Sequence, residues 1–413
     1  EKLSLDYGLK IGKAIESEWF KRDSGTNRFA SNQNNFHKLR LYARGEQAIQ
    51  KYKDELSING DLSYLNLDWK PVPIIPKFVD IVVNGISERT FDIKAYSQDP
   101  HGVDKRTRYM DRILADMKAQ ELNEYAAEAF GINLQASELE TLPSNEEELQ
   151  LHMQLNYKQA VEIAEEQAIN VLLEGNRYEL TRKKVNYDLC VLGIGCVKNS
   201  FNKSKGVTVE YVDPANVVYS YTEDPYFEDI YYFGEIKTIP INEIVKEFPN
   251  LTQEELKSLH NQGHQTTGFY NRSLAESVNQ DKNQIQVLYF NYKTYMNEVY
   301  KIKETATGAH KVIVKDDEFN PVLDQAIEQR FGKLSKQIEV LFEGAMVLGT
   351  KQMLRWRLAP NMMRPKSDYT KVKMNYSIVA PRMYKGKIES LVSRITTFAD
   401  MIQLTHLKIQ QVM

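Results

Sequence analysis

Two glycine-containing motifs have residue types that could bind phosphate or a dinucleotide, but each lacks part of the required pattern. A phosphate-binding loop needs four residues between its glycines and a Ser or Thr after its lysine. The stretch "GLKIGKA" at residues 8–14 departs from both requirements, because Ala14 cannot ligate magnesium. The stretch "GIG" at residues 193–195 follows a helical pattern, precedes a strand pattern and lacks a third glycine. This order is the reverse of a dinucleotide fingerprint, so we interpret it as a turn.

The side chains that could ligate a metal or act as nucleophiles do not form a recognisable set. His260 and His264 are four residues apart and could share a helix face, but Gly263 weakens that helix and no third ligand lies nearby. Three adjacent carboxylates begin at Glu146; on a helix they point in different directions, so we interpret them as a solvated charge run. No Ser/His/Asp or Cys/His arrangement suggests a nucleophile. We therefore expect no enzyme activity, no cofactor and no metal site.

A basic segment between residues 351 and 387 is the stronger candidate for a binding surface. It has ten Lys and Arg residues against one acid, Asp368, in a chain whose net charge is -3 and whose pI is about 6.3. Trp356 and three tyrosines lie among the cations. Such a surface could contact a phosphate backbone or an acidic partner protein, or it could meet the acids of another copy of the chain. Both interpretations stay open. The candidate contact residues are Lys351, Arg355, Arg357, Arg364, Lys366, Lys371 and Lys373.

Length and composition limit the class of protein. The chain of 413 residues is long enough for two or three modules, and its hydrophobic content of 42% can build real cores. Cys190 and Cys196 are the only cysteines, and no signal peptide precedes them, so we expect reduced thiols in a cytosolic fold. The chain begins with Glu1 and ends on Met413 inside a helical pattern. We expect it to be part of a longer polypeptide.

A proline-rich segment leads into an apolar run that is too short to cross a membrane. Residues 74–86 are interrupted by Lys77 and Asp80, whereas a spanning helix needs about 20 apolar residues. Phe78, Val82 and Ile86 recur at helical spacing, which predicts a core helix with these side chains on its buried face. The alternation in residues 91–96 then predicts a half-buried strand.

Elsewhere helical and strand patterns alternate along the chain, which predicts an α+β fold with a helical front and end. Helices are expected in residues 1–60, broken by a polar loop at 23–35, and in most of residues 104–192, broken by an acidic loop. Short helices are expected at 242–248 and 252–260, the latter with a Thr252–Glu255 capping box. The expected strands and hairpins are 196–201 with 207–212, 212–221, 229–239, 283–295 with 297–308, and a hairpin at 336–350 that turns at Glu343 and Gly344. Residues 317–337 are expected to be helical.

The last segment, from Lys387 to Met413, predicts a helix with a heptad-like seam. The seam positions are Ile388, Leu391, Ile395, Phe398, Ile402, Ile409 and Val412. Such a seam needs a neighbouring helix, although an ordinary amphipathic helix packed on its own chain has the same pattern. The other positions carry both signs of charge without a cluster, and include Arg394, Thr397, Asp400, Gln403, Lys408 and Gln411.

Four stretches, taken in their order along the chain, carry a resemblance to a known family. They are "WKPVPIIPKFVDIVVNGISER" (residues 69–89), "NYDLCVLGIGCVKNSF" (186–201), "VEYVDPANVVYSY" (209–221) and "PRMYKGKIESLVSRITTFADMIQLTHLKI" (381–409). With this order of structural motifs the chain resembles the portal proteins of tailed bacteriophages, most closely those of the crAss-like phages.

The resemblance implies a subunit of a ring, usually of twelve copies, at one vertex of the viral capsid. Double-stranded DNA would pass through the ring, and the partners would be the major capsid protein, the packaging motor (terminase) and the neck or adaptor proteins, with no membrane involved. With this resemblance the chain is expected to divide into 1–103 (N-terminal helices and first wing elements), 158–316 (an α/β wing), 317–384 (a clip with the basic segment) and 385–413 (the start of a stem helix). Residues 104–157 are expected to be an acidic helical insertion, which the family does not lead us to expect. The six polar residues of the last segment would line the channel, and a crown would follow the stem.

Two other functions remain open from the sequence alone. The chain could be another virion neck or connector protein, or the non-catalytic half of an enzyme that processes nucleic acid. The connector hypothesis predicts a smaller and simpler chain than this one, and the enzyme hypothesis requires clustered carboxylates or a phosphate loop.

Overall fold

The computed structural model describes residues 2–20, 28–57, 67–88, 93–96, 99–131, 142–143, 145–155, 160–202, 206–249, 251–258, 284–304, 310–315 and 331–412. Helices make up 49% and strands 26% of these residues, which confirms the predicted mixture of helix and sheet. The chain forms two compact units, which are Glu1–Glu88 with Leu180–Met413 (unit 1) and Arg89–Glu179 (unit 2). Within the described ranges, no helix has the length and apolar character needed to span a membrane.

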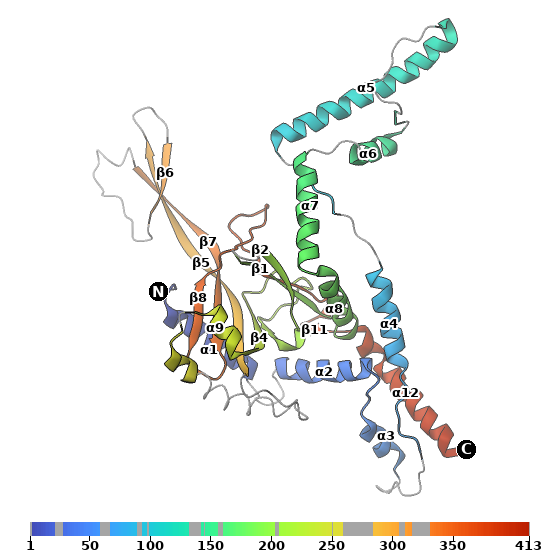
Figure 1. Ribbon diagram of the computed structural model, residues 1–413, viewed down its shortest axis with the longest axis vertical. Helices are drawn as coiled ribbons and strands as arrows, with labels where there is room; N and C mark the ends of the chain where they lie inside the picture. The colour runs from blue at the N-terminus through green and yellow to red at the C-terminus, as the bar shows by residue number, and fades with distance from the viewer. Residues whose placement is uncertain are drawn as a thin grey trace. The chain divides into compact units, whose positions relative to one another are not determined.

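The described part of unit 1 contains two main antiparallel sheets and one short two-stranded pair (Figure 1). The larger sheet has the order β3-β4-β5-β7-β8, with β6 paired to β5. Its strands are β3 (Val217–Tyr219), β4 (Tyr232–Pro240), β5 (Gln284–Glu304), β6 (His310–Lys315), β7 (Phe331–Val347) and β8 (Met353–Leu358). The smaller sheet has the order β2-β1-β9, formed by β1 (Gly195–Asn202), β2 (Gly206–Tyr211) and β9 (Tyr376–Val379). The core between these elements includes the fully buried rings of Phe233, Phe290 and Phe342.

The helices of unit 1 contact the sheets or one another. They are α1 (Leu5–Phe20), α2 (Arg28–Ala43), α3 (Ile49–Leu56), α4 (Ile74–Ser87), α8 (Tyr178–Val191), α9 (Ile241–Glu247) and α12 (Leu391–Val412). Helix α1 packs against β7 and β8. Its glycines permit this approach, because a Cβ added at Gly8 would lie 2.5 Å from the Trp356 ring and one at Gly12 would lie 3.1 Å from Met346. The motif "GLKIGKA" therefore lies within helix α1, where its two glycines allow close packing on the sheet.

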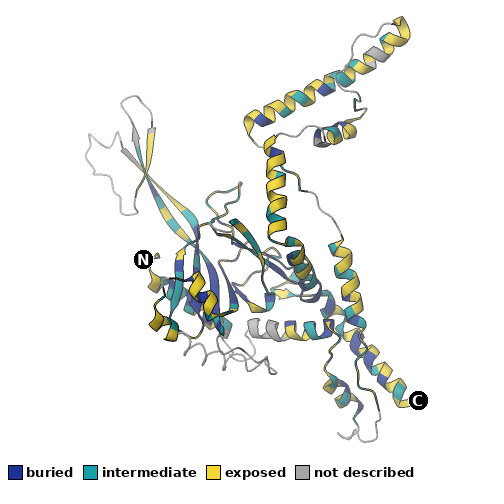
Figure 2. Cartoon of the chain, in the orientation of Figure 1, coloured by how far each residue is buried: buried dark blue, intermediate teal, exposed yellow. Residues whose placement is uncertain are grey.

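Unit 2 is helical and has a small core of its own. It contains α5 (Pro100–Phe130), α6 (Glu146–Leu155), α7 (Ala160–Gly175) and the first residues of α8. Ile113, Leu149 and Met153 form its buried cluster. Most of the described surface of α5 and α7 is exposed (Figure 2). The carboxylates that begin at Glu146 are exposed in the first turn of α6, which confirms a solvated charge run.

Several sequence predictions are confirmed in unit 1. Strands β1 and β2 form the predicted hairpin, with Val197 opposite Tyr211. The predicted helix at 242–248 is α9, and β3 and β4 lie in the predicted strand segments. In the capping box, the Thr252 amide donates to Glu255 Oε2 at 2.9 Å, and the Glu255 amide donates to Thr252 Oγ1 at 3.4 Å.

The strand predictions for the second half of the chain are partly wrong. Residues 284–304 form one strand, β5, rather than two, and residues 331–337 belong to β7 rather than to a helix. Glu343 and Gly344 lie inside β7, and the chain turns at residues 348–351 instead. Gly344 is required by packing, because a Cβ there would lie 2.4 Å from the Phe290 ring. Residues 93–96 are not a strand either.

The predicted buried face of α4 is also wrong. Ile75 and Val79 are buried, whereas Phe78 is 54% exposed and Ile86 is exposed. Helix α12 begins at Leu391 rather than Lys387, because β10 (Met383–Tyr384) and β11 (Lys387–Ile388) pair in a small hairpin. The described part of residues 317–384 supplies β7, β8, β9 and β10 to the sheets of unit 1 and forms no separate unit.

Candidate functional site

Helix α12 is fixed to the N-terminal helices of unit 1 by a buried carboxylate, that of Asp400. Asp400 accepts hydrogen bonds from the hydroxyls of Tyr42 at 2.9 Å and Tyr52 at 2.6 Å, and from Lys51 Nζ at 2.6 Å. Burial alone would raise the pKa of Asp400, but the hydrogen bonds from Lys51, Tyr52 and Tyr42 outweigh burial and lower this pKa. The ionised carboxylate therefore joins α12 to α2 and α3.

Gln403 fixes the same helix to the proline-rich segment before α4. Its Oε1 accepts a hydrogen bond from the Val72 amide at 2.9 Å, and its Nε2 donates to the Lys70 carbonyl at 3.4 Å. Pro71 and Pro73 have no amide hydrogen, so the Val72 N–H is the backbone donor between them. One turn further on, Leu407 is fully buried in a cluster with Tyr52 and Leu56.

These contacts show that the predicted channel-lining role is wrong for two of the six residues. Asp400 and Gln403 are buried against their own chain and cannot line a channel in this structure. Their polarity serves hydrogen bonds to partners more than 300 residues away in sequence, and no local pattern reveals such partners. The other four, Arg394, Thr397, Lys408 and Gln411, are exposed.

The rest of α12 presents two more faces. Phe398, which is 62% exposed, lies on the predicted apolar seam with the exposed side chains of Ile402 and Ile409. Successive helical residues are ~100° apart, so this seam lies about 125° around the helix from the buried face. Thr397 and Lys408 lie about 115° further round. The helix thus has a face for its own chain, an exposed apolar seam and a third exposed face, on which Met401 lies between the polar residues Thr397 and Lys408.

The basic segment is less available for an outside partner than its sequence suggests. Arg355 lies 3.0 Å from Glu247 and 3.8 Å from Glu343, and Arg357 also pairs with Glu343. Arg364 donates to the carbonyls of Tyr369 and Glu339, both at 2.9 Å.

The other predicted contact residues are four lysines, and Arg364 also donates to the backbone carbonyl of one of them, Lys371, at 3.5 Å. Lys373 lies 3.8 Å from Glu228. The other three, Lys351, Lys366 and Lys371, are exposed. The structure therefore divides the predicted contact residues between internal ion pairs and scattered surface lysines.

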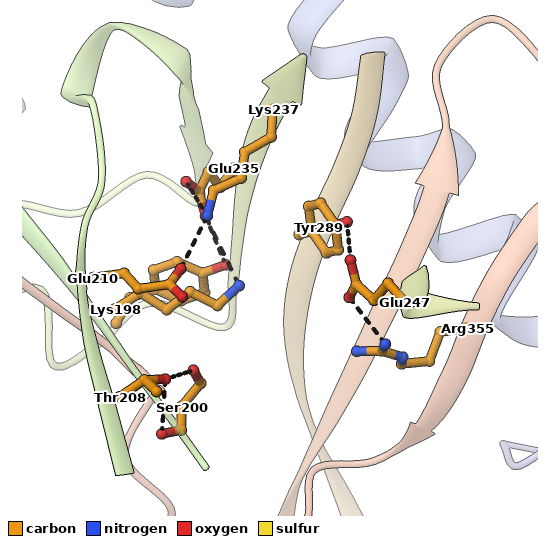
Figure 3. A network of polar contacts seen from close by, with 10 residues as sticks. Lys198, Ser200, Thr208, Glu210, Glu235, Lys237, Glu247, Tyr289 and Arg355 are labelled. Atoms are coloured by element: carbon orange, nitrogen blue, oxygen red, sulfur yellow. Dashed lines mark hydrogen bonds and ion pairs between the residues drawn. The ribbon is translucent and has the colours of Figure 1, made fainter. Parts of the chain in front are cut away.

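A partly buried polar network that the sequence did not indicate joins the two sheets (Figure 3). Lys198 of β1 lies over the rings of Tyr289 and Tyr376, and its Nζ is 3.9 Å from Glu235 of β4. Burial lowers the pKa of Lys198, although Glu235 opposes this shift. Lys237 lies 3.3 Å from Glu235 and 3.2 Å from Glu210. Tyr289 belongs to the larger sheet and Tyr376 to the smaller one. Because Lys198 contacts a ring from each sheet, the network is suited to holding the two sheets together.

No protein-family model matches the chain, and no curated protein matches it. The remaining motifs of the sequence have structural roles where the structure describes them. Gly193 has φ +81° and lies so close to the Glu389 carbonyl oxygen that an added Cβ would be 2.6 Å from it, which confirms the turn. His260 and His264 lie outside the described residues. Over the described ranges, no group of three or more His, Cys, Asp or Glu side chains could hold a metal ion.

Proposed function

We propose that the chain is a structural subunit of a ring that acts as the portal of a tailed bacteriophage. The observation that carries the proposal is the division of α12 into three faces. One face is anchored to its own chain through Asp400 and Gln403, and the apolar seam with Phe398 and Ile402 is left exposed. A helix that is fixed on one side and apolar on another is suited to packing against the same helix of a neighbour.

The third face of α12 would then point towards the axis of the ring. Thr397 and Lys408 are exposed there, and Arg394 at its border pairs with Glu389 at 3.4 Å. A passage for DNA benefits from such sparse and partly neutralised charge, because a dense positive surface would bind phosphates and slow their movement. The 22 residues of α12 span ~33 Å, enough to line a substantial part of a channel wall.

In this proposal the ring, usually of twelve copies, occupies one vertex of the virion capsid, where DNA is packaged and ejected. The subunit contacts the major capsid protein, and a separate terminase motor and the neck proteins dock on the ring. The chain itself would not hydrolyse ATP or cut DNA. Lys351 and Lys371 of the basic segment are exposed on unit 1, where such docking could take place.

The seam can be tested by its effect on assembly. Ile402→Asp places a charge in the apolar seam, while Thr397→Asp places the same charge on the polar face of the same helix. Native mass spectrometry should show rings for wild type and Thr397→Asp, and single folded chains for Ile402→Asp. Rings formed equally well by Ile402→Asp would contradict the assignment of the seam to a neighbouring copy.

A further inference from the structure

The basic segment ends in the small hairpin of β10 and β11, which directly precedes α12. In this hairpin Tyr384 lies opposite Lys387, and Met383 lies opposite Ile388. Directly opposite residues of an antiparallel pair share a face, and neighbouring residues of a strand point to opposite faces. Met383 and Ile388 pack against the largest buried cluster of unit 1, so Tyr384 and Lys387 lie on the outer face of the hairpin.

The outer face presents an aromatic ring beside two cations. Tyr384 is 74% exposed, more than any other tyrosine in the described part of the chain. Lys387 is exposed opposite it, and Lys385 Nζ lies 5.5 Å from the centre of its ring. A lone exposed tyrosine is ordinary, but surfaces that bind single-stranded nucleic acid combine an exposed ring with positive charge.

The positive charge of the hairpin is available to a ligand. Neither Lys385 nor Lys387 forms an ion pair with the residues that the structure describes. The arginines of strand β8, in contrast, pair with glutamates of the chain. The two lysines therefore carry positive charge that the described fold does not neutralise.

Lysine at position 385 is an unfavourable choice for the turn itself. Lys385 has φ +47° and Gly386 has φ +72°, the pattern of a two-residue hairpin turn in which both central residues are left-handed. Asparagine, aspartate and glycine are preferred at the first of these positions, because most side chains are strained there. A strained cation beside an exposed ring indicates a contact that the fold alone does not require.

A carboxylate limits this surface on one side of the turn. An added Cβ at Gly386 would lie 3.0 Å from the ring of Tyr221, so this ring borders the turn. The Tyr221 hydroxyl donates to Glu223 at 2.6 Å. Since this carboxylate would repel an anion, phosphates should approach from the side of Lys385 and Lys387. Tyr221 is therefore the boundary of the surface.

We propose that the outer face of this hairpin binds single-stranded nucleic acid, with a base stacked on Tyr384 and backbone phosphates at Lys385 and Lys387. Every base has a flat face that can stack on an exposed aromatic ring, and lysines bind the phosphates between bases. A DNA duplex has free base faces only at its ends, so it could use the lysines but not the ring. The inference does not depend on the proposed ring of subunits, because a single chain carries the whole surface.

Fluorescence anisotropy of a labelled oligothymidylate with the purified full chain tests the proposal. Tyr384→Ala should weaken binding about tenfold, whereas Tyr384→Phe, which keeps the ring, should bind as wild type does. Tyr369→Ala is the matched control, because Tyr369 is 67% exposed in the same basic segment, and it should leave binding unchanged. Equal binding by wild type and Tyr384→Ala would overturn the stacking contact.

Lys385→Asn separates the contact from the fold. Asparagine suits the left-handed position, so this variant should unfold at the same temperature as wild type or at a higher one. Its binding should nevertheless be weaker, and the slope of log K against log salt concentration should become less steep by about 0.7, since one phosphate contact is lost. An affinity and a salt slope unchanged by Lys385→Asn would contradict the role of this lysine.

Competition identifies the class of ligand. Unlabelled oligothymidylate should displace the probe, whereas its duplex with oligoadenylate and polyglutamate should each compete about tenfold less well. Equal competition by the duplex or by polyglutamate would mean a general anion surface and would overturn the proposal. Rings that bind no oligothymidylate would overturn this inference alone, and chains that bind it but form no ring would overturn the portal proposal alone.

Discussion

Tyr52 donates a hydrogen bond of 2.6 Å to the carboxylate of Asp400, although 348 residues separate the two in sequence. This contact joins the N-terminal helices to the C-terminal helix and decides which face of α12 remains available to a neighbour. Asp400 was predicted to line a channel because it is polar, but its carboxylate instead anchors α12 within the chain.

Removing the anchor should lower the free energy of unfolding. Asp400→Ala leaves the hydroxyl of Tyr42 without its acceptor in a buried site, and the expected loss is about 2–4 kcal/mol in urea unfolding. Lys51→Met is the control, because Lys51 is largely exposed and its ion pair should contribute less than about 1 kcal/mol. Equal stability of Asp400→Ala and wild type would show that the hydrogen bonds to Asp400 do not stabilise the fold.

The Asp400 carboxylate should also make the free energy of unfolding depend on pH. The pKa of Asp400 is lowered in the folded chain, so its contribution is fully present above the pKa of an unfolded carboxyl and is lost as the pH falls. The difference in unfolding free energy between wild type and Asp400→Asn should therefore shrink between about pH 5 and pH 3. A difference that stays constant or grows over this range would contradict the lowered pKa.

Gly344 should not tolerate a methyl group. Gly344→Ala would place its Cβ 2.4 Å from the Phe290 ring, and the overpacking should cost about 1–3 kcal/mol of stability. Adding Phe290→Leu should recover part of the loss, giving a favourable coupling energy in a double-mutant cycle.

Gly85→Ala in α4 is the control for this substitution. No atom lies within 4 Å of an added Cβ there, and a helical alanine should raise stability by about 0.5–1 kcal/mol. Thermal unfolding should show that Gly344→Ala lowers stability and that Gly85→Ala raises it. A Gly344→Ala variant more stable than wild type would show that Phe290 moves aside easily.

Arg364 should matter for stability, whereas Lys371 should not. The Arg364 guanidinium donates to the carbonyls of Tyr369 and Glu339, so Arg364→Ala should cost about 1–2 kcal/mol by leaving these acceptors unpaired. Lys371→Ala, at an exposed position of the same basic segment, should change stability by less than about 0.5 kcal/mol. Chemical denaturation of the two variants tests this difference, and equal effects would mean that Arg364 is merely another surface cation.

Local patterns in the sequence predicted many elements correctly because the deciding interactions are themselves local. The capping box at Thr252 and Glu255 is made within four residues, and the β1–β2 hairpin is made across one short turn. The exposed part of the seam of α12, with Phe398, Ile402 and Ile409, was predicted for the same reason, since residues three and four apart share a face. Three other predicted seam residues are used within the chain: Ile388 lies in β11, and Leu391 and Ile395 pack against its own core.

The errors occurred where distant contacts decide the structure. Glycine at position 344 reads as a turn signal, but it is set by Phe290 on the neighbouring strand. Phe78 and Val82 have the right spacing for a buried face of α4, yet the chain buries Ile75 and Val79 instead. The excess positive charge of the basic segment is real, but the sequence could not show that Glu247 and Glu343 lie beside its arginines.

The central claim is tested most directly by electron microscopy of the purified wild-type protein. The account predicts a ring with a central hole in which neighbouring α12 helices contact each other through Phe398, Ile402 and Ile409, while Thr397 and Lys408 face the hole. Particles that remain single chains or closed dimers, or a ring whose α12 helices lie far from its axis, would contradict it.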